Sequence, residues 1–478
     1  MITVMKQNLQ EALKGLSKVV CAKTNLPILA CVRIKAENDT LTLSGTDLEQ
    51  WLDCRLPFAE KLEPLDCIVR LEALKEFIEG GSGRSMLGIE TAAANSVRLS
   101  MEIAGQRMER QFETMPVADW PANRPLPDSM SPVSKEIFSL MKLAFPSASR
   151  DDTRRAITGI CLDKDGIIAT DGSQLAKLNF VLPIKEQVIL PNTRMLSSGF
   201  FKDDGTMGVV MDKKDITHVS FQSGAWQYTV RCIVASYPNF NQVIPREASL
   251  KNRIVFTAED IAMLEKSIPK LEGYKDDPQG IVMYAGGKGV KFMSRQPSSS
   301  VKIETRAEYK GWRTDLIAAM NRKYVMRALE LGFTELRFSD AYSAFMSSGK
   351  AGIYVFMPMR NVRDIEACWK KIGITPNKED KMTEKKTEAA AAEKKVETQT
   401  APKTGMQFKP QGAQETAADP FEELRTAADE IRLAAKALAD SAAMIQRKIT
   451  DAQKSVKQKE KDFKETRDLI ERLKSKAA

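Results

Sequence analysis

Two pairs of adjacent acids, Asp151-Asp152 and Asp276-Asp277, are the side chains in this sequence best suited to metal-dependent chemistry. Carboxylates bind divalent cations, and a nuclease could use such a pair. Each pair lies in an apparent turn, where neighbouring acids are more often solvated loop residues. A metal-dependent nuclease is therefore the less favoured alternative.

Other catalytic groups are scarce. There is a single histidine, His218, inside a strand-like run, and none of the seven cysteines belongs to a Cys-x-x-Cys pair. The glycine-rich segment 80–85 lacks the Gly-Lys-Ser/Thr of a phosphate-binding loop. We therefore expect a non-catalytic protein without cofactor or metal, in which His218 is a strand residue and the thiols are mostly buried and reduced.

Composition sets the class of protein. The 478 residues carry 72 lysines and arginines against 63 acids, a formal net charge of +9. A mild basic excess fits a nucleic-acid partner without demanding one. We see neither a signal-peptide pattern nor an apolar run of about 20 residues that could span a membrane, so we expect a cytoplasmic protein.

The helices and strands predicted from the sequence recur about every 120 residues. Amphipathic helices are predicted around residues 9–20, from Ser134, and from Thr257, which we expect to cap its helix with Asp260 at the third position. Each is followed by two strands joined by a short turn, at 38–39, 163–166 and 286–289. The pattern predicts an α+β fold of three units built from antiparallel hairpins.

Beyond residue 361 the composition changes. Residues 377–418 contain few large apolar side chains, which predicts a flexible linker. From 420 to about 475, apolar residues follow a heptad pattern, which predicts a coiled coil or a docking helix. The expected organisation is globular units at 1–125, 126–250 and 251–361, a linker at 362–419 and a helical tail at 420–478.

Short motifs carry a resemblance to a known family. Gly45-Thr-Asp-Leu-Glu49 is echoed 124 residues later by Ala169-Thr-Asp-Gly172. The sequence resembles the beta sliding clamps, the beta subunits of bacterial DNA polymerase III. The matching runs are Thr24-Asn-Leu-Pro-Ile-Leu29, Leu41-Thr-Leu-Ser-Gly-Thr-Asp-Leu-Glu49, Ala169-Thr-Asp-Gly-Ser-Gln-Leu175, Tyr237-Pro-Asn-Phe240 with Val243-Ile-Pro245, and Tyr354-Val-Phe-Met-Pro-Met-Arg360.

The resemblance implies a non-catalytic processivity factor of the replicative polymerase. Two copies of a three-domain chain would form a head-to-tail ring around duplex DNA, with sheets outside and helices lining a central hole. Weak, sequence-independent phosphate contacts suit a ring that must slide, although any single cation could equally be ordinary solvated surface. The implied lining cations are Lys14, Lys18, Lys23, Lys135, Lys142, Arg150, Arg154, Arg155, Lys266, Arg322, Lys323 and Arg327.

The resemblance also implies a cleft between the second and third domains. It would bind short peptides of polymerases, the clamp loader and repair proteins that contain Gln and Leu or Phe. The residues carried over are Ile157, Thr170, Gly172, Ser173, Gln174, Leu175, Pro238, Gln242, Val243, Val355, Met357, Pro358, Met359 and Arg360. Ser173, Gln174 and Gln242 depart from the family pattern, so charged partner peptides would bind differently. A DNA-associated coiled-coil structural protein on a clamp-like platform is the other alternative.

Overall fold

The computed structural model describes residues 1–373 except 22, 80–84, 94, 104, 122–123, 214, 297–298, 300, 312–314, 360–367, 369 and 371. The predicted linker and helical tail, at 362–419 and 420–478, lie almost wholly outside the described residues. Every helix in the described part is too short or too polar to cross a membrane.

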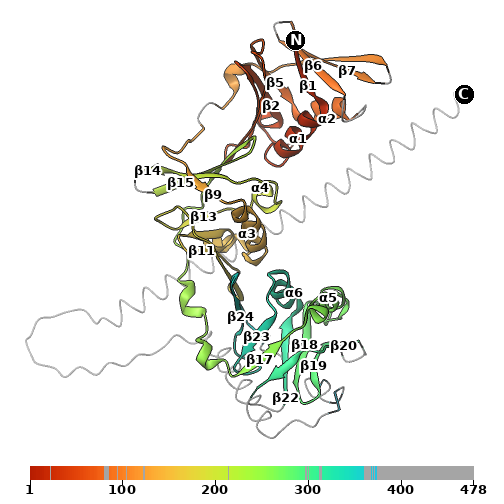
Figure 1. The fold of residues 1–478 in the computed structure, drawn as a ribbon, viewed down its shortest axis with the longest axis vertical. Helices are drawn as coiled ribbons and strands as arrows, with labels where there is room; N and C mark the ends of the chain where they lie inside the picture. Colours follow the sequence, from red (N-terminus) through yellow and green to blue (C-terminus); the bar gives the residue numbers. More distant parts are fainter. Residues whose placement is uncertain are drawn as a thin grey trace, which may run out of the picture. The chain divides into compact units, whose positions relative to one another are not determined.

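The chain repeats one sequence of elements, a strand, a helix and three further strands (Figure 1). The first unit contains β1 (Ile2–Met5), α1 (Lys6–Leu16), β2 (Cys31–Glu37), β3 (Thr40–Thr46), β4 (Gln50–Pro57), β5 (Leu65–Arg70), α2 (Leu71–Ile78), β6 (Met86–Ala93), β7 (Ser96–Ile103) and β8 (Gln106–Glu113). This is the βαβββ order twice over, β1 to β4 and β5 to β8.

The second and third units follow the same order. The second contains β9 (Ser131–Val133), α3 (Glu136–Ala144), β10 (Ile160–Asp163), β11 (Gly166–Thr170), β12 (Gln174–Asn179), β13 (Val188–Leu190), α4 (Arg194–Ser197), β14 (Gly205–Asp212), β15 (Asp215–Ser223) and β16 (Trp226–Arg231). The third contains β17 (Asn252–Val255), α5 (Ala258–Ser267), β18 (Gly280–Gly286), β19 (Gly289–Ser294), β20 (Lys302–Glu304), an extra strand β21 (Glu308–Lys310), β22 (Asp315–Asn321), α6 (Arg322–Glu330), β23 (Glu335–Phe338), β24 (Phe345–Gly349) and β25 (Gly352–Phe356).

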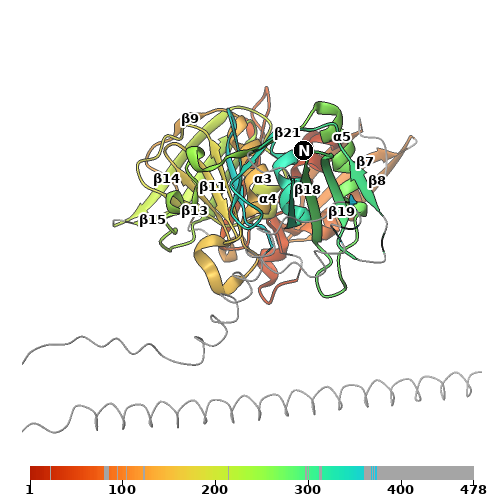
Figure 2. The ribbon, with the colours of Figure 1, turned by 90° about the horizontal axis from the view of Figure 1, so that it is seen from below.

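The two halves of each unit exchange their first strands. β1 pairs with β6 rather than with β2, and β5 pairs with β2, so each unit holds two antiparallel sheets of four strands, with β21 as a fifth strand in one sheet of the third unit. β9 and β13, and then β17 and β22, do the same. The paired helices α1 and α2, α3 and α4, and α5 and α6 contact each other within their units (Figure 1). The pair α3 and α4 is also seen together in Figure 2.

Neighbouring units are joined by continuous sheets. β4 of the first unit pairs antiparallel with β16 of the second, giving an eight-stranded sheet. β12 of the second unit pairs with β25 of the third, giving a nine-stranded sheet that includes β21. In both cases the last strand of a first half joins the last strand of the following unit's second half. Among the described strands, two such last strands lie at the end of a sheet. They are β8, the last strand of the first unit's second half, and β20, the last strand of the third unit's first half.

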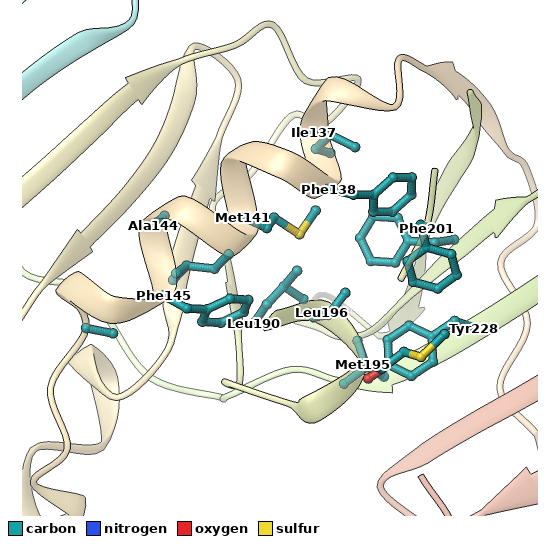
Figure 3. Close-up of a cluster of buried hydrophobic side chains, with 14 of the residues drawn as sticks. Ile137, Phe138, Met141, Ala144, Phe145, Leu190, Met195, Leu196, Phe201 and Tyr228 are labelled. Atoms are coloured by element: carbon teal, nitrogen blue, oxygen red, sulfur yellow. The ribbon is translucent and has the colours of Figure 1, made fainter. Parts of the chain in front are cut away.

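A continuous apolar core fills the space between helices and sheets. In the second unit α3 places Ile137, Phe138 and Met141, all fully buried, along one face (Figure 3). The ring of Phe138 lies 4.7 Å from that of Phe201, centroid to centroid. Their positions follow the helical period that the sequence shows, because residues three or four apart share a face.

The local predictions are confirmed within the described residues. The three hairpins and the helices near Ser134 and Thr257 form where expected, whereas the first helix begins at Lys6 and ends at Leu16 instead of spanning 9–20. Thr257 and Asp260 make a reciprocal capping box, with Asp260 N donating to Thr257 Oγ1 at 3.1 Å. Ile261 is only half-buried, whereas Leu264 and Ile268 are buried as predicted. The domain boundaries stay predictions; 125 and 250 fall in the connections between β8 and β9 and between β16 and β17.

Candidate functional site

The turn between β11 and β12 is held by an unusually complete set of hydrogen bonds. The Asp171 carboxylate accepts from the backbone N–H groups of Ser173 and Gln174 at 2.8 and 2.9 Å, and from the Gln174 side-chain amide at 2.8 Å. The Thr170 hydroxyl donates to the Gln174 carbonyl at 2.6 Å and accepts from Gly172 N. This chemistry fixes the path of residues 170–174.

The same turn ties three elements together. Tyr354 of β25 donates its buried hydroxyl to Gln174 Oε1 at 2.6 Å, and Tyr324 of α6 donates to Asp171 Oδ2 at 3.2 Å. Burial, together with the neighbouring Asp171 carboxylate, raises the pKa of Tyr324. Both phenols therefore stay protonated and act as donors at neutral pH. Gln174 is buried and satisfied at both ends of its amide, so it positions the turn and does not line a cleft, which corrects its predicted peptide contact.

The turn between β3 and β4 repeats most of this network. The Asp47 carboxylate accepts from Glu49 N, Gln50 N and Gln50 Nε2 at 3.0, 2.7 and 2.7 Å. Tyr228 donates to Gln50 Oε1 at 2.7 Å. The repeat seen in the sequence is therefore a repeat of hydrogen bonds, and the first-unit turn is a natural reference for the second.

The two turns differ at the residue that must adopt a left-handed backbone conformation. Leu48 has φ 75°, and its counterpart Gly172 has φ 91°. Arg154 explains the glycine, because its guanidinium covers Gly172 and donates from Nη1 to the Asp171 carbonyl at 3.0 Å. A Cβ at position 172 would lie 2.6 Å from that Nη1. Arg154 therefore lies at the rim of this turn with an exposed side chain, and its predicted DNA contact stays a prediction.

A cavity of about 590 Å³ opens beside the turn. Met357 and Met359, which follow β25, provide flexible apolar walls, and Ser173 and Tyr324 lie on the polar side. Backbone hydrogen bonds hold residues 357–359 in place, since Met357 N donates to the Ser173 carbonyl and Met359 N to the Ala319 carbonyl, both at 2.8 Å. The full lining is Ser173, Tyr274, Asp276, Asp277, Arg295, Asn321, Tyr324, Met357, Pro358 and Met359.

The predicted peptide residues are divided between this cavity and its surroundings. Ser173, Met357, Pro358 and Met359 line the cavity. Ile157, Leu175 and Val355 belong to one buried cluster with Tyr237 and Phe240, formed by the elements around the cavity. Val243 is 59% exposed, and Pro238 and Gln242 are also at the surface. Thr170 and Gly172 belong to the turn, and Arg360 lies outside the described residues.

Sequence reasoning missed much of the cavity's polar wall. Arg295, whose side chain is only 4% exposed, pairs with Asp277 and lies over the ring of Tyr274, at 5.3 Å from the ring centroid. Its Nη1 is 3.7 Å from Met359 Sδ. Asp277, the second acid of the pair Asp276-Asp277, therefore forms an ion pair with Arg295. The sequence indicated only that this pair of acids lies in a turn.

Replacing Gly172 by alanine should weaken the cavity's rim selectively. The left-handed backbone costs an alanine about 1 kcal/mol, and the new methyl group must displace the Arg154 guanidinium. We expect the affinity for a labelled peptide with an initial glutamine and a final Leu-Phe to fall about tenfold, measured by fluorescence anisotropy.

Leu48→Ala is the matched control, because it alters the equivalent residue of the first-unit turn, which already tolerates a side chain. It should leave peptide affinity within about twofold of the unmodified chain. Equal losses in the two variants would contradict the role given to Arg154 and Gly172.

A second feature is cationic. Lys14, Lys142 and Lys266 are exposed in the last turns of α1, α3 and α5, the equivalent helices of the three units. A lysine is stabilised there by the negative end of the helix dipole. The further predicted cations that are exposed are Lys23, Lys135, Arg150, Arg154, Arg155 and Lys323. Lys18 is half-buried, with its ammonium 5.8 Å from the ring centroid of Phe200.

Two predicted DNA contacts are engaged inside the protein. Arg322 donates to the carbonyls of Pro269 and Leu271 and to Gln279 Oε1, at 3.1, 2.7 and 3.0 Å. Arg327 pairs with Glu330 at 2.7 Å, and its side chain is 16% exposed. Both guanidinium groups therefore have partners within the third unit, and their predicted DNA contacts stay predictions.

The acidic, histidine and cysteine side chains considered above for metal binding or catalysis are explained by their structural surroundings. Asp151 caps a short 3-10 helix, η4 (Asp152–Ile157), where hydrogen bonds from Thr153 lower the pKa of its carboxyl. His218 lies in β15 beside Trp51, and burial lowers its pKa. Six of the seven cysteines are buried free thiols, and Cys21 is exposed. In the described part of the chain, no three His, Cys, Asp or Glu side chains gather as a metal site would require.

Repeated α+β units joined edge to edge by continuous sheets give the fold of a DNA clamp. The solved structures agree. The sliding clamp of Pseudomonas aeruginosa in its complex with griselimycin is 22% identical, with a TM-score of 0.65 over 75% of this chain and 99% of that one. The beta subunit of Thermotoga maritima is 19% identical, with a TM-score of 0.62 over 75% and 99%.

Sequence comparison gives the same likeness. Residues 1–122 match the family model of the DNA polymerase III beta subunit, N-terminal domain. The beta sliding clamp of Pseudomonas aeruginosa is 24% identical over 386 residues, and that of Escherichia coli K12 is 23% identical over 393. Each alignment covers 75% of this chain and 99% of the relative. Over this length the chain is similar to the bacterial beta sliding clamps.

Proposed function

We propose that this chain is the processivity factor of a replicative DNA polymerase, closing as a head-to-tail homodimer around duplex DNA. The observation that carries the proposal is the way its sheets are joined. Both internal junctions unite the last strand of a first half with the last strand of the next unit's second half. Among the described strands, β20 is the last strand of a first half and β8 the last strand of a second half, and each lies at the end of its sheet without such a partner. They belong to the third and the first unit, at opposite ends of the series of units.

Open strand edges of this kind favour pairing with another chain. Because β20 and β8 differ, the contact is head to tail, and such contacts close into a ring when the rotation between copies allows it. Two three-unit chains then give six units with six equivalent junctions. A closed ring holds DNA by topology, so it needs no sequence-specific contact and no catalytic group.

The lysines suit a sliding surface. Lys14, Lys142 and Lys266 recur once per unit, at the ends of equivalent helices. Each phosphate contact of an exposed lysine is weak and screened by salt, which permits movement along the duplex. We propose these three, with Lys23, Lys135, Arg150, Arg155 and Lys323, as the DNA-facing cations, and place the protein in the cytoplasm.

The cavity suits short peptides from polymerases, the clamp loader and repair proteins. Its methionines can repack around different apolar side chains, while the network around Asp171 keeps the polar rim fixed. Ser173, Met357, Pro358 and Met359 would contact the peptide directly. The proposed domains are those predicted from the sequence, with the site lying between 126–250 and 251–361.

Retention on circular DNA tests the proposal. The full chain is loaded onto a nicked circular plasmid with a clamp loader, separated from free protein by gel filtration, and then treated with a restriction enzyme that cuts the plasmid once. We expect the protein to stay with circular DNA and to leave within minutes of linearisation, because a ring escapes only over an end.

A second linear plasmid whose ends are blocked by bound protein is the control, and it should retain the clamp. Equal binding to circular and open linear DNA would overturn the ring and favour the DNA-associated structural protein. Cleavage of the plasmid in the presence of Mg²⁺ would instead support the nuclease alternative.

A further inference from the structure

The loop between α4 and β14, residues 198–204, carries two adjacent aromatic residues with different partners. Phe201 is buried in the core of the second unit, where its ring lies 4.7 Å from that of Phe138, centroid to centroid (Figure 3). Phe200 is only half-buried, and its ring meets that of Trp226 in β16 edge to face at 4.7 Å. Phe201 therefore fixes the loop to the core, while Phe200 stays partly accessible at the surface.

α1 of the first unit packs onto this loop at Gly15. A Cβ at Gly15 would lie 2.7 Å from Cζ3 of Trp226 and 2.9 Å from Cζ of Phe200, so only glycine permits the contact. A glycine inside a helix is less favourable than alanine, and the close approach of the aromatic rings explains why it is present. The contact fixes the end of α1, and with it the residues that follow, against a loop of the second unit.

Two lysines from different units lie against adjacent residues of the loop. The Lys18 ammonium, just after α1, is 5.8 Å from the ring centroid of Phe200, within the range of a cation–π contact. The Lys142 side chain, in the last turn of α3, crosses Gly199, where a Cβ would lie 3.0 Å from its Cδ and 3.5 Å from its Nζ. Gly199 also has a positive φ of 64°, which favours glycine. Each lysine thus has one loop residue that limits where its ammonium can lie.

The charges around these two lysines suit an anionic ligand. Within the described residues, neither ammonium pairs with a carboxylate. The acids of the loop have other contacts, since Asp204 Oδ1 accepts from Lys135 N at 2.8 Å and Asp203 Oδ2 lies beside Gly224. Lys202, in the same loop, is exposed and adds positive charge. A nucleic-acid backbone, with phosphates at regular intervals, can contact cations from two units at once.

We propose that the loop 198–204 is a positioning element for DNA binding, in which Phe200 holds the Lys18 ammonium and Gly199 admits the Lys142 side chain, so that both meet backbone phosphates. This inference rests on the proposed function, because it requires duplex DNA to pass the helices of the ring. It adds Lys18 to the cations that contact DNA, and it makes Phe200 and Gly199 residues that act on DNA only through a lysine. A lysine that is already confined loses less side-chain freedom on binding.

The equivalent lysine of the third unit provides the comparison. Lys266 is exposed in the last turn of α5, and among the described residues no aromatic ring and no ion pair confines it. Its side chain must be immobilised when it meets a phosphate. We therefore expect Lys266→Ala to weaken DNA binding less than Lys18→Ala does.

Binding of a short fluorescein-labelled DNA duplex to the full chain at low salt, followed by anisotropy, tests the proposal. Lys18→Ala should weaken binding about fivefold and lower the slope of log K against log salt by about 0.9, the value for one phosphate contact. Phe200→Leu keeps an apolar side chain against Trp226 but releases Lys18, so it should weaken binding by a similar factor. Phe200→Tyr keeps the ring and should recover most of the affinity.

A double-mutant cycle separates positioning from a structural role. Because Phe200 acts through Lys18, adding Phe200→Leu to Lys18→Ala should cause no further loss. Gly199→Ala added to Lys142→Ala should likewise cause none. Further losses of similar size in the double variants would overturn the proposal, as would unchanged affinity in Phe200→Leu.

Phe256→Leu is the matched control for the loss of a ring. Phe256 is buried in the third unit, with its ring 6.3 Å from that of Phe292, centroid to centroid. The variant should lower the unfolding temperature and leave DNA affinity unchanged. A loss of DNA affinity equal to that of Phe200→Leu would assign the effect to general destabilisation and overturn the proposal.

The unmodified chain distinguishes this inference from the function it rests on. If its binding to duplex DNA does not depend on salt, or if it stays on linearised plasmid, the DNA-encircling ring itself is wrong. If Lys18→Ala and Lys142→Ala weaken binding while Phe200→Leu and Gly199→Ala do not, the DNA contact stands and only the positioning role of the loop is wrong.

Discussion

Replacing Asp171 by alanine should lower the affinity of the cleft for a peptide ending in Leu-Phe by at least tenfold. The carboxylate accepts four hydrogen bonds, from Ser173 N, Gln174 N, Gln174 Nε2 and the Tyr324 hydroxyl. A hydrogen bond to a charged group is worth about 1.5–3 kcal/mol. Without the carboxylate the turn loses its fixed path, and Ser173, which lines the cavity and accepts from Met357 N, moves with it.

The first-unit turn supplies the control for this experiment. Asp47→Ala removes the same bonds to residues 49 and 50, and Gln50 likewise accepts from a buried tyrosine, Tyr228. Both variants should lower the unfolding temperature by similar amounts. Only Asp171→Ala should weaken peptide binding in fluorescence anisotropy, while Asp47→Ala stays within about twofold.

A merely structural role for Asp171 would give parallel losses in the two variants. Asp171→Asn adds a second test, because it keeps one oxygen for the backbone N–H groups of residues 173 and 174 but offers an N–H to the donors of Gln174 and Tyr324. We expect it to bind peptide more weakly than the unmodified chain and more tightly than Asp171→Ala. Wild-type affinity in Asp171→Ala would refute the positioning role.

The features that the sequence predicted are those controlled by local interactions. The cap of α5 needs only Thr257 and Asp260, three residues apart, and the hairpin turn at Asn38 needs one residue that tolerates a positive φ of 55°. The repeat of the Thr-Asp motif was visible for the same reason, since the hydrogen bonds within each turn join residues at most four apart. Such signals survive in a sequence whatever the rest of the chain does.

The features that escaped prediction depend on distant residues. The third unit has a related turn, in which Asp340 accepts from Tyr342 N, Ser343 N and the Ser343 hydroxyl, but serine replaces the threonine and glutamine of the motif. The sequence indicated that three arginines, Arg154, Arg322 and Arg327, are surface cations. The groups that they bind are brought near by the tertiary structure or lie on a helix that was not predicted. Tyr274, Arg295 and Tyr324 meet in one cavity from three separate elements.

The duplication within each unit was also invisible. Exchange of first strands puts β1 next to β6 and β5 next to β2, so strand pairs that are close in space are far apart in sequence. The halves share an order of elements and little sequence, because a buried strand tolerates many apolar residues at alternate positions. The junctions between units, on which the ring depends, follow from this exchange.

Arg124→Ala should open the junction between the first and second units. Arg124 lies in the segment after β8, and its guanidinium pairs with Asp53 of β4 while donating to Thr229 Oγ1 and the Gln227 carbonyl of β16, at 3.2 and 3.1 Å. Burial lowers the pKa of Arg124, and Asp53 opposes that shift by stabilising the charged form. Truncation leaves the Asp53 carboxylate, 17% exposed, without this partner, at a cost of about 3 kcal/mol.

Hydrogen exchange locates that loss. In Arg124→Ala the amides of the β4 and β16 ladder should exchange at least tenfold faster, whereas those of the β12 and β25 ladder keep their protection, because the second junction contains none of these contacts. Adding Asp53→Asn removes the uncompensated charge and should recover at least half of the protection. Equally faster amide exchange in both ladders would mean that Arg124 stabilises the whole fold. The contacts of Arg124 would then not hold the first junction independently. If the first junction does open alone, a clamp can loosen within one subunit as well as between two.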